Sequence, residues 1–69
     1  MKKKLRIKNN LRKYRIWKNV TQKQLAKEIE ISTNTIRNIE KYWIYPNYMV
    51  RKRICDCFNV SQDQMFYLD

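Results

Sequence analysis

The sequence predicts an all-α fold, a compact bundle of four or five helices that forms a single domain. Its 69 residues are enough for one modest hydrophobic core and leave no room for a second domain. Helix-start signals of one type recur three times, and no stretch alternates apolar and polar residues for long enough to indicate a sheet. The chain has no glycine, so its tight turns must be closed by other residues such as asparagine.

Apolar spacing and end signals place the helices. A first helix over 7–18 sets Ile7, Leu11 and Tyr14 on one stripe and ends at Asn19, a residue type that tolerates the left-handed conformation. Residues 1–6 precede it as a basic arm that we expect to be flexible, and residues 7–69 form the folded domain. Further helices are expected over 22–29, 33–41 and 48–58, followed by a short fifth helix or turn that reaches about Phe66.

Two of the helix starts lie close together. Thr21 can cap a helix with Gln24 as its reciprocal partner, and Ser32 can cap another helix eleven residues later. Only about eight helical residues and a tight turn fit between them, so the two helices must cross at a steep angle. The second helix carries polar residues on the face opposite Ile36 and Ile39. A short polar helix held out from a small core has the geometry that enters the major groove of DNA.

The charge balance favours the same class of partner. Sixteen Lys and Arg against six Asp and Glu give a formal net charge of +10 and a pI near 10.0. An excess of this size favours a polyanionic partner, namely DNA, RNA or an anionic membrane surface. The alternative is a basic domain that is merely well solvated.

Cysteine and histidine content argues against several kinds of site. Cys55 and Cys57 lie two residues apart in a helical pattern, so they point to different faces and cannot bridge each other. Two cysteines without any histidine make no zinc site, and we expect neither a metal nor a cofactor. No apolar run approaches the ~20 residues of a membrane span, and the basic start lacks the apolar segment of a signal peptide. We therefore expect a cytoplasmic protein with reduced thiols and with no membrane or small-molecule partner.

Several short motifs follow one another in a fixed order. They consist of Leu11, Arg12 and Arg15; Thr21, Gln22, Leu25 and Ala26; Ile31, Ser32, Thr35 and Ile36; Glu40 and Pro46; and Ile54, Cys55, Phe58, Val60 and Ser61. In this order and spacing, the chain resembles the lambda-repressor and Cro type of helix-turn-helix proteins, called the XRE family, from Leu11 to Phe66. The resemblance implies a lambda-repressor-like domain that binds double-stranded DNA and is encoded by a bacterium, a phage or a mobile element.

Three residues depart from the family pattern. Glu30 and Tyr42 stand where the family usually has glycine, and a glutamate at positive φ costs about 1 kcal/mol. Arg51 stands at a position that is normally leucine-like, so it either weakens the core or turns outward with its stem along apolar surface. None of the three lies on the expected DNA face, so these departures bear on stability more than on function.

The expected DNA contacts come from the start of the second helix and from the third. The resemblance implies that Gln22 contacts a phosphate and braces the third helix, which is the recognition helix. Thr33, Asn34, Arg37 and Asn38 share one face and are candidates for base contacts, because Asn can pair with adenine, Arg with guanine and Thr with a thymine methyl group. The alternative is a solvated face that touches only phosphates. The full set of expected DNA-binding residues is Gln22, Lys23, Ser32, Thr33, Asn34, Thr35, Arg37, Asn38 and Lys41.

Arg15 and Glu40 lie in otherwise apolar stretches. The resemblance implies that they form a structural ion pair between the first and third helices. Because burying either charge alone is costly, loss of one partner is expected to destabilise the fold by about 3–5 kcal/mol. The alternative is two independent surface charges.

A domain of this size contacts only about four to six base pairs, so useful specificity favours a homodimer on a palindromic site. The expected dimer surface comprises residues 64–69 and the face of the fourth helix. The basic arm either lies along phosphates or the minor groove, or adds nonspecific affinity as a tail. Apolar residues in excess of what so small a core needs are Trp17, Tyr48, Phe66, Tyr67 and Leu68.

These features predict a sequence-specific transcription regulator, a small repressor that occupies an operator and blocks polymerase. One alternative is an antitoxin that binds DNA through the same domain and also binds a toxin. Another is a nonspecific nucleic-acid-binding or membrane-active basic protein, although the separate capping signals argue against one continuous amphipathic helix. An enzyme is not expected, because the chain has no histidine, no glycine-rich phosphate loop and too few acidic residues for a metal site.

Overall fold

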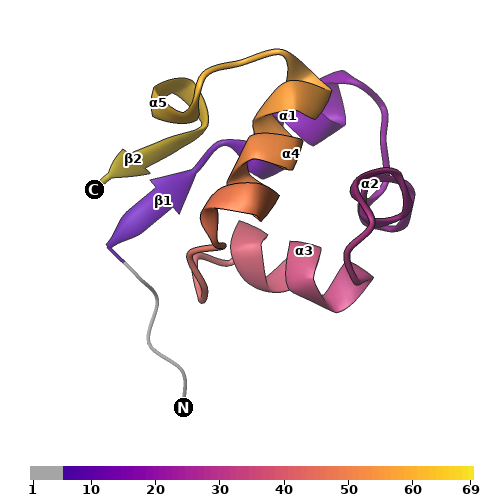
Figure 1. The fold of residues 1–69 in the computed structure, drawn as a ribbon, viewed down its shortest axis with the longest axis horizontal. Helices are drawn as coiled ribbons and strands as arrows, with labels where there is room; N and C mark the ends of the chain where they lie inside the picture. The colour runs from indigo at the N-terminus through magenta and orange to yellow at the C-terminus, as the bar shows by residue number, and fades with distance from the viewer. Residues whose placement is uncertain (1–5) are drawn as a thin grey trace.

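Residues 6–69, which the computed structural model describes, form five helices and a small two-stranded sheet. Most of the expected basic arm, including Lys2, Lys3 and Lys4, lies outside the described residues. Figure 1 shows α4 in front of α1, with α2 at the right, α3 below, and the sheet and α5 at the left. In chain order the elements are β1 (Ile7–Asn9), α1 (Leu11–Trp17), α2 (Gln22–Ile29), α3 (Thr33–Glu40), α4 (Tyr48–Phe58), α5 (Gln62–Met65) and β2 (Phe66–Leu68).

The prediction of an all-α fold is wrong at the two ends of the domain. β1 and β2 pair antiparallel in the register Ile7↔Leu68, Lys8↔Tyr67 and Asn9↔Phe66. As a result the first helix begins at Leu11 and not at residue 7, and α5 stops before Phe66. A three-residue strand is too short to show an alternating pattern, and its partner lies at the opposite end of the sequence. No local pattern therefore indicates this sheet.

One hydrophobic core lies between the helices. Ile36 and Ile39 of α3 are completely buried in it, which fixes one face of that helix against the domain. Phe66 is also buried, at 8% exposure, because β2 folds it back onto the core; the assignment of Phe66 to surplus apolar surface is therefore wrong. The other fully buried large side chains are Leu11, Leu25, Ile54 and Met65.

Four residues without glycine's freedom close the turns in the left-handed region. Asn19 and Asn59 have φ of 56°, as their position after a helix predicts. Glu30 and Tyr42 have φ of 61° and 62°, which confirms that both stand at positions where glycine would be unstrained. At the end of α2, the backbone N–H groups of Glu30 and Ile31 both donate to the carbonyl of Ala26, and the bond from Ile31, at 3.0 Å, closes the turn that leads to α3.

Candidate nucleic-acid interface

Reciprocal capping fixes the helix-turn-helix unit from α2 to α3. At the start of α2, Gln24 N–H donates to Thr21 Oγ1 at 3.0 Å, and Thr21 N–H donates to Gln24 Oε1 at 2.8 Å. At the start of α3, Thr35 N–H donates to Ser32 Oγ at 3.0 Å. Both helix starts are therefore where the sequence predicts them, and each satisfies a backbone donor that would otherwise have no partner within the helix.

The outer face of α3 presents polar side chains to solvent. Asn34 and Arg37 are exposed, and Thr33 and Asn38 beside them are half-buried. Arg37 Nη1 donates to Asn34 Oδ1 at 3.4 Å, a long contact between two exposed groups that water can replace. The four candidates for base contact thus lie on the side of α3 that faces away from the core.

The remaining candidates surround this face. The hydroxyls of Ser32 and Thr35 are 2.7 Å apart, so one donates to the other beside the capping bond. Lys23 on α2 and Lys41 directly after α3 are exposed, and the ammonium of Lys41 lies 4.7 Å from the ring centroid of Trp43. The two hydroxyls thus lie at the start of α3, and the ammonium of Lys41 follows its end.

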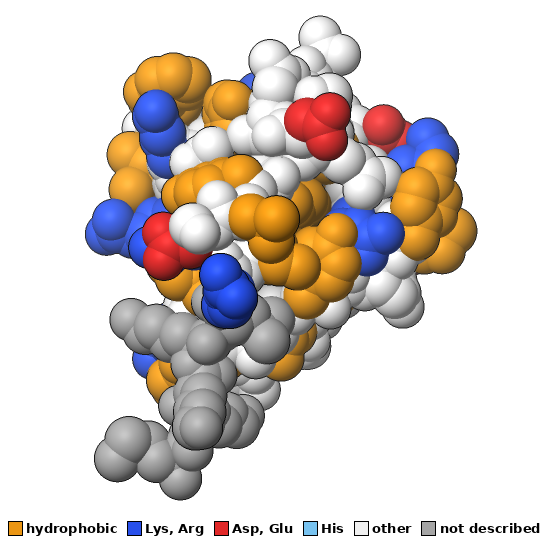
Figure 2. Space-filling model, turned by 90° about the vertical axis from the view of Figure 1, so that its left-hand side faces the viewer, with side chains coloured by type: hydrophobic (Ala, Val, Ile, Leu, Met, Phe, Trp, Pro, Cys, Tyr) orange, Lys and Arg blue, Asp and Glu red, His pale blue; other side chains and the backbone are white. Residues whose placement is uncertain are grey.

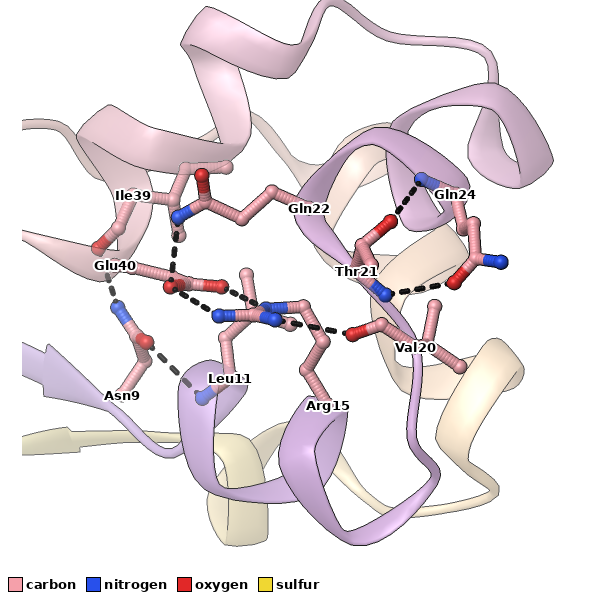
Figure 3. Close-up of polar contacts among 9 residues, drawn as sticks. All are labelled: Asn9, Leu11, Arg15, Val20, Thr21, Gln22, Gln24, Ile39 and Glu40. Atoms are coloured by element: carbon pink, nitrogen blue, oxygen red, sulfur yellow. Dashed lines mark hydrogen bonds and ion pairs between the residues drawn. The ribbon is translucent and has the colours of Figure 1, made fainter.

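Arg15 and Glu40 meet at the end of α3, where Figure 3 shows their side chains between α1 and α3. Arg15 Nε and Nη2 donate to the two carboxylate oxygens at 2.6 and 3.2 Å, and Nη1 donates to the carbonyl of Val20 at 3.0 Å. Only 13% of the Arg15 side chain and 6% of the Glu40 side chain are exposed. The two-point contact orients the last turn of α3 against α1.

Gln22 belongs to the same network. Its Nε2 donates to Glu40 Oε1 at 3.1 Å, which ties the first turn of α2 to the last turn of α3 (Figure 3). In this structure Gln22 therefore binds a carboxylate within the protein. A carboxamide nitrogen carries two protons, so Gln22 can hold Glu40 and still donate to a second acceptor.

Asn9 is a site residue that sequence reasoning missed. Its Oδ1 accepts from Leu11 N–H at 3.1 Å, and its Nδ2 donates to the carbonyl of Ile39 at 2.8 Å. The asparagine pair before the apolar residue Leu11 is the signal that could have marked a helix start there. The bond to α3 has no such local signal.

Arg51 resolves the question raised by its place in α4. The side chain is half-buried, and its Nη1 and Nε donate to the carbonyl of Pro46 at 2.7 Å and to Gln62 Oε1 at 3.0 Å. Its guanidinium carbon lies 4.5 Å from the ring centroid of Tyr45. Arg51 thus turns away from the core and joins α4 to α5 and to the loop before α4.

The two thiols are free and lie apart from the α3 face. Cys55 is buried in the core, and burial raises its pKa. Cys57 donates to Glu28 Oε2 at 3.1 Å, and partial burial together with this hydrogen bond raises the pKa of Cys57 to about 11. Both thiols are therefore protonated at neutral pH. Between residues 6 and 69, no group of Cys, Asp and Glu is arranged to hold a metal ion. The described helices include none that is both long and apolar enough to cross a bilayer.

The steeply joined helices α2 and α3, with the second exposing a polar face, define a helix-turn-helix domain. A family model described as a helix-turn-helix domain matches residues 4–68. The chain therefore belongs to this family, in its XRE type, and the resemblance noted between Leu11 and Phe66 is confirmed.

The chain is similar to a protein of Methanocaldococcus jannaschii that is named as an uncharacterised helix-turn-helix-type transcriptional regulator. The two are 37% identical over 60 residues, which cover 87% of this chain and 91% of the relative. Two crystal structures of the clp gene regulator ClgR from Corynebacterium glutamicum share the fold, with TM-scores of 0.69 and 0.67, each at 23% identity over 75% of this chain. The matched region spans 55% of the first ClgR chain and 68% of the second.

Proposed function

We propose that this chain is a transcription regulator that binds double-stranded DNA sequence-specifically by placing α3 in the major groove. The observation that carries the proposal is the two-sided character of α3. Ile36 and Ile39 are wholly buried, while Asn34 and Arg37 are exposed on the opposite side. A helix anchored in this way can enter a groove without losing its core contacts. The name of the archaeal relative, a transcriptional regulator, supports the regulatory role.

The polar face of α3 has the groups needed to distinguish base pairs. Arg37 can donate two parallel hydrogen bonds to a guanine, and Asn34 can pair bidentately with an adenine. Thr33 and Asn38 flank them on the same side and complete a contact surface about one helical turn long. In the free protein the hydrogen bond between Arg37 and Asn34 is long, at 3.4 Å, so breaking it to place both side chains against bases costs little free energy.

Phosphate contacts would fix the position of α3 in the groove. Gln22 keeps one amide proton for a phosphate while its other holds Glu40. Ser32 and Thr35 share one hydroxyl proton between them, which leaves the second for an anion. Lys23 in the first turn of α2 and Lys41 directly after α3 add positive charge. Their contribution should weaken as salt rises, because releasing counterions from DNA then gains less free energy.

We further propose that the protein represses by occupying its operator as a homodimer. Its surface includes apolar side chains beyond those of the core: Leu68 is 77% exposed and Tyr67 39%. Together with Ile7, Tyr45 and Phe66 they line a shallow hollow of about 140 Å³ at the sheet. Figure 2, which views the side of the sheet and α5, shows hydrophobic side chains gathered there among Lys and Arg. A two-fold dimer would double the number of base pairs contacted.

Selection of bound sequences from random DNA tests the proposal. We expect an enriched palindrome whose half-sites lie about 34 Å apart, one turn of B-DNA. Running the selection at two salt concentrations separates the ionic share of affinity, since log K falls by about 0.9 for each phosphate contact per unit of log salt. No enriched sequence at either salt concentration would contradict sequence-specific binding. If sedimentation shows a monomer bound to a single half-site, the proposed dimer is contradicted and sequence-specific binding is not.

A further inference from the structure

Asn9 is the one uncharged polar residue that is buried in the described part of the chain, with 7% exposure. Burying a carboxamide is unfavourable unless its hydrogen-bonding groups find partners. Both polar atoms of the Asn9 carboxamide have partners: Oδ1 accepts from the first N–H of α1, and Nδ2 donates to the carbonyl of Ile39 at 2.8 Å. Figure 3 shows the side chain between the end of β1 and the last turn of α3.

The position of Asn9 is set by elements other than α3. Asn9 pairs with Phe66 in the sheet, and the backbone N–H of the next residue, Asn10, donates to the carbonyl of Met65 at 2.9 Å. The chain at Asn9 is therefore held by β2 and α5. Through the Asn9 carboxamide, this fixed strand is joined directly to the backbone of α3.

The acceptor lies in the last turn of α3. The carbonyl of Ile39 also accepts from the backbone N–H of Tyr42 at 3.0 Å, in the turn that follows the helix, so Asn9 is the donor that reaches this oxygen from a different part of the fold. The same end of α3 is held from a second direction by the pair of Arg15 and Glu40. The ion pair comes from α1 and the carboxamide from β1, so together they restrict the tilt of α3 in two directions.

We infer that Asn9 is a positioning residue for the DNA-contacting face: it transfers the position of the β1–β2 sheet to α3 and sets the tilt of that helix. This inference rests on the proposed function of α3. The eight residues of α3 span about 12 Å, so a tilt of roughly 5° moves one end by about 1 Å. Hydrogen bonds to base edges do not tolerate such a shift, whereas phosphate contacts by Lys41 and Lys23 adapt to it. Loss of the Asn9 bridge should therefore reduce specificity more than nonspecific affinity.

Asn9→Ser and Asn10→Ser form a matched pair of variants. The serine at residue 9 keeps an acceptor close to Leu11 N–H but is too short to reach the carbonyl of Ile39. Asn10 also donates through Nδ2 to a backbone carbonyl, that of Gln64 at 3.0 Å, but this bond leads to α5 and not to α3. Each substitution removes one such donor without changing the charge.

The first measurement is the ratio of affinities for the selected DNA site and a scrambled site, at a temperature where both variants are folded by circular dichroism. We expect Asn9→Ser to lower this ratio by roughly tenfold and Asn10→Ser to leave it nearly unchanged. The second measurement is the orientation of α3 relative to α1 in the free proteins, from residual dipolar couplings. We expect α3 to rotate in Asn9→Ser only.

Equal ratios for the two variants, or an unchanged α3 orientation in Asn9→Ser, would overturn the positioning role. If the wild-type protein does not distinguish the two DNA sites, the proposed function fails, while the dipolar couplings still decide whether Asn9 positions α3. If Asn9→Ser does not fold, the wild-type protein provides the test. A scalar coupling through the hydrogen bond from Asn9 Nδ2 to the carbonyl carbon of Ile39 supports the bridge, and its absence overturns it.

Discussion

Glu40→Gln tests whether the buried contact at the end of α3 holds the domain together. The substitution keeps the shape of the side chain and removes its charge. The Arg15 guanidinium, which is largely buried, then has no counter-charge. Removing one partner of a buried pair typically costs about 3–5 kcal/mol. The same carboxylate also accepts from Gln22 Nε2 at 3.1 Å, so the change weakens a second contact. We expect the free energy of unfolding to fall by about 3–5 kcal/mol.

This loss is large for a chain of this length. A 69-residue domain is stabilised by roughly 3–10 kcal/mol in total, so a substantial fraction of Glu40→Gln would be unfolded at room temperature. The assay is urea denaturation at low temperature followed by circular dichroism. With a slope of about 1 kcal/mol per M, the expected shift of the midpoint is about 3–5 M.

Asp56→Asn is the matched control. It removes the same charge from the Lys52–Asp56 pair on α4, whose side chains are 53% and 68% exposed. Because solvent screens such a pair, we expect a loss of only about 0.3–0.5 kcal/mol. If Glu40→Gln were no more destabilising than Asp56→Asn, Arg15 and Glu40 would be independent surface charges energetically, and the reasoning from their burial would be refuted.

Three further predictions concern the DNA face, the turn and a thiol. Arg37→Ala should weaken binding to the selected site by about 1–3 kcal/mol and relax one base position, measured by titration against selected and random DNA; an equal loss on both would exclude base contact. Glu30→Gly should stabilise the domain by about 0.5–1 kcal/mol in urea denaturation because φ is 61°, whereas Lys27→Gly inside α2 should destabilise it; destabilisation by both would show that the turn is not strained. Folding raises the pKa of Cys57 from 9.0 to about 11, so as the pH rises this thiol ionises in the unfolded chain before it does in the folded one. The contribution of the protonated Cys57 to stability is therefore complete below pH 9 and is lost as the pH rises toward 11. Alkylation of Cys57 followed by mass spectrometry should show a lower midpoint in Glu28→Gln, and an unchanged midpoint would mean that Glu28 does not contribute to the raised pKa.

Local signals were sufficient to predict the helix-turn-helix unit. Thr21 and Ser32 find their capping partners three residues further along the chain, so their role is visible in the sequence. The same is true of Asn59, which follows the last residue of α4 and takes the left-handed conformation. The motif order from Leu11 to Phe66 added the family, and with it the pairing of Arg15 with Glu40 that the structure contains.

The features that were missed depend on partners far away in the chain. The bond from Asn9 to Ile39 spans 30 residues, and the sheet joins the two ends of the described chain. No pattern in a short window can show such a pairing, because each strand alone is too short to alternate. For the same reason, the sequence left open whether Arg51 would weaken the core or turn outward. Its acceptors, Pro46 and Gln62, come together only when α4 and α5 pack.

By itself, the sequence determined which segments are helical, where most of them begin and end, and that α3 has one apolar and one polar face. These properties follow from interactions between residues at most a few positions apart. Only the tertiary structure decided that the domain closes with a sheet, that Phe66 is buried, and that Asn9 supports the last turn of α3. The physical reason is that a buried polar group needs a hydrogen-bond partner, and a partner that is distant in the sequence comes close to it only when the chain folds.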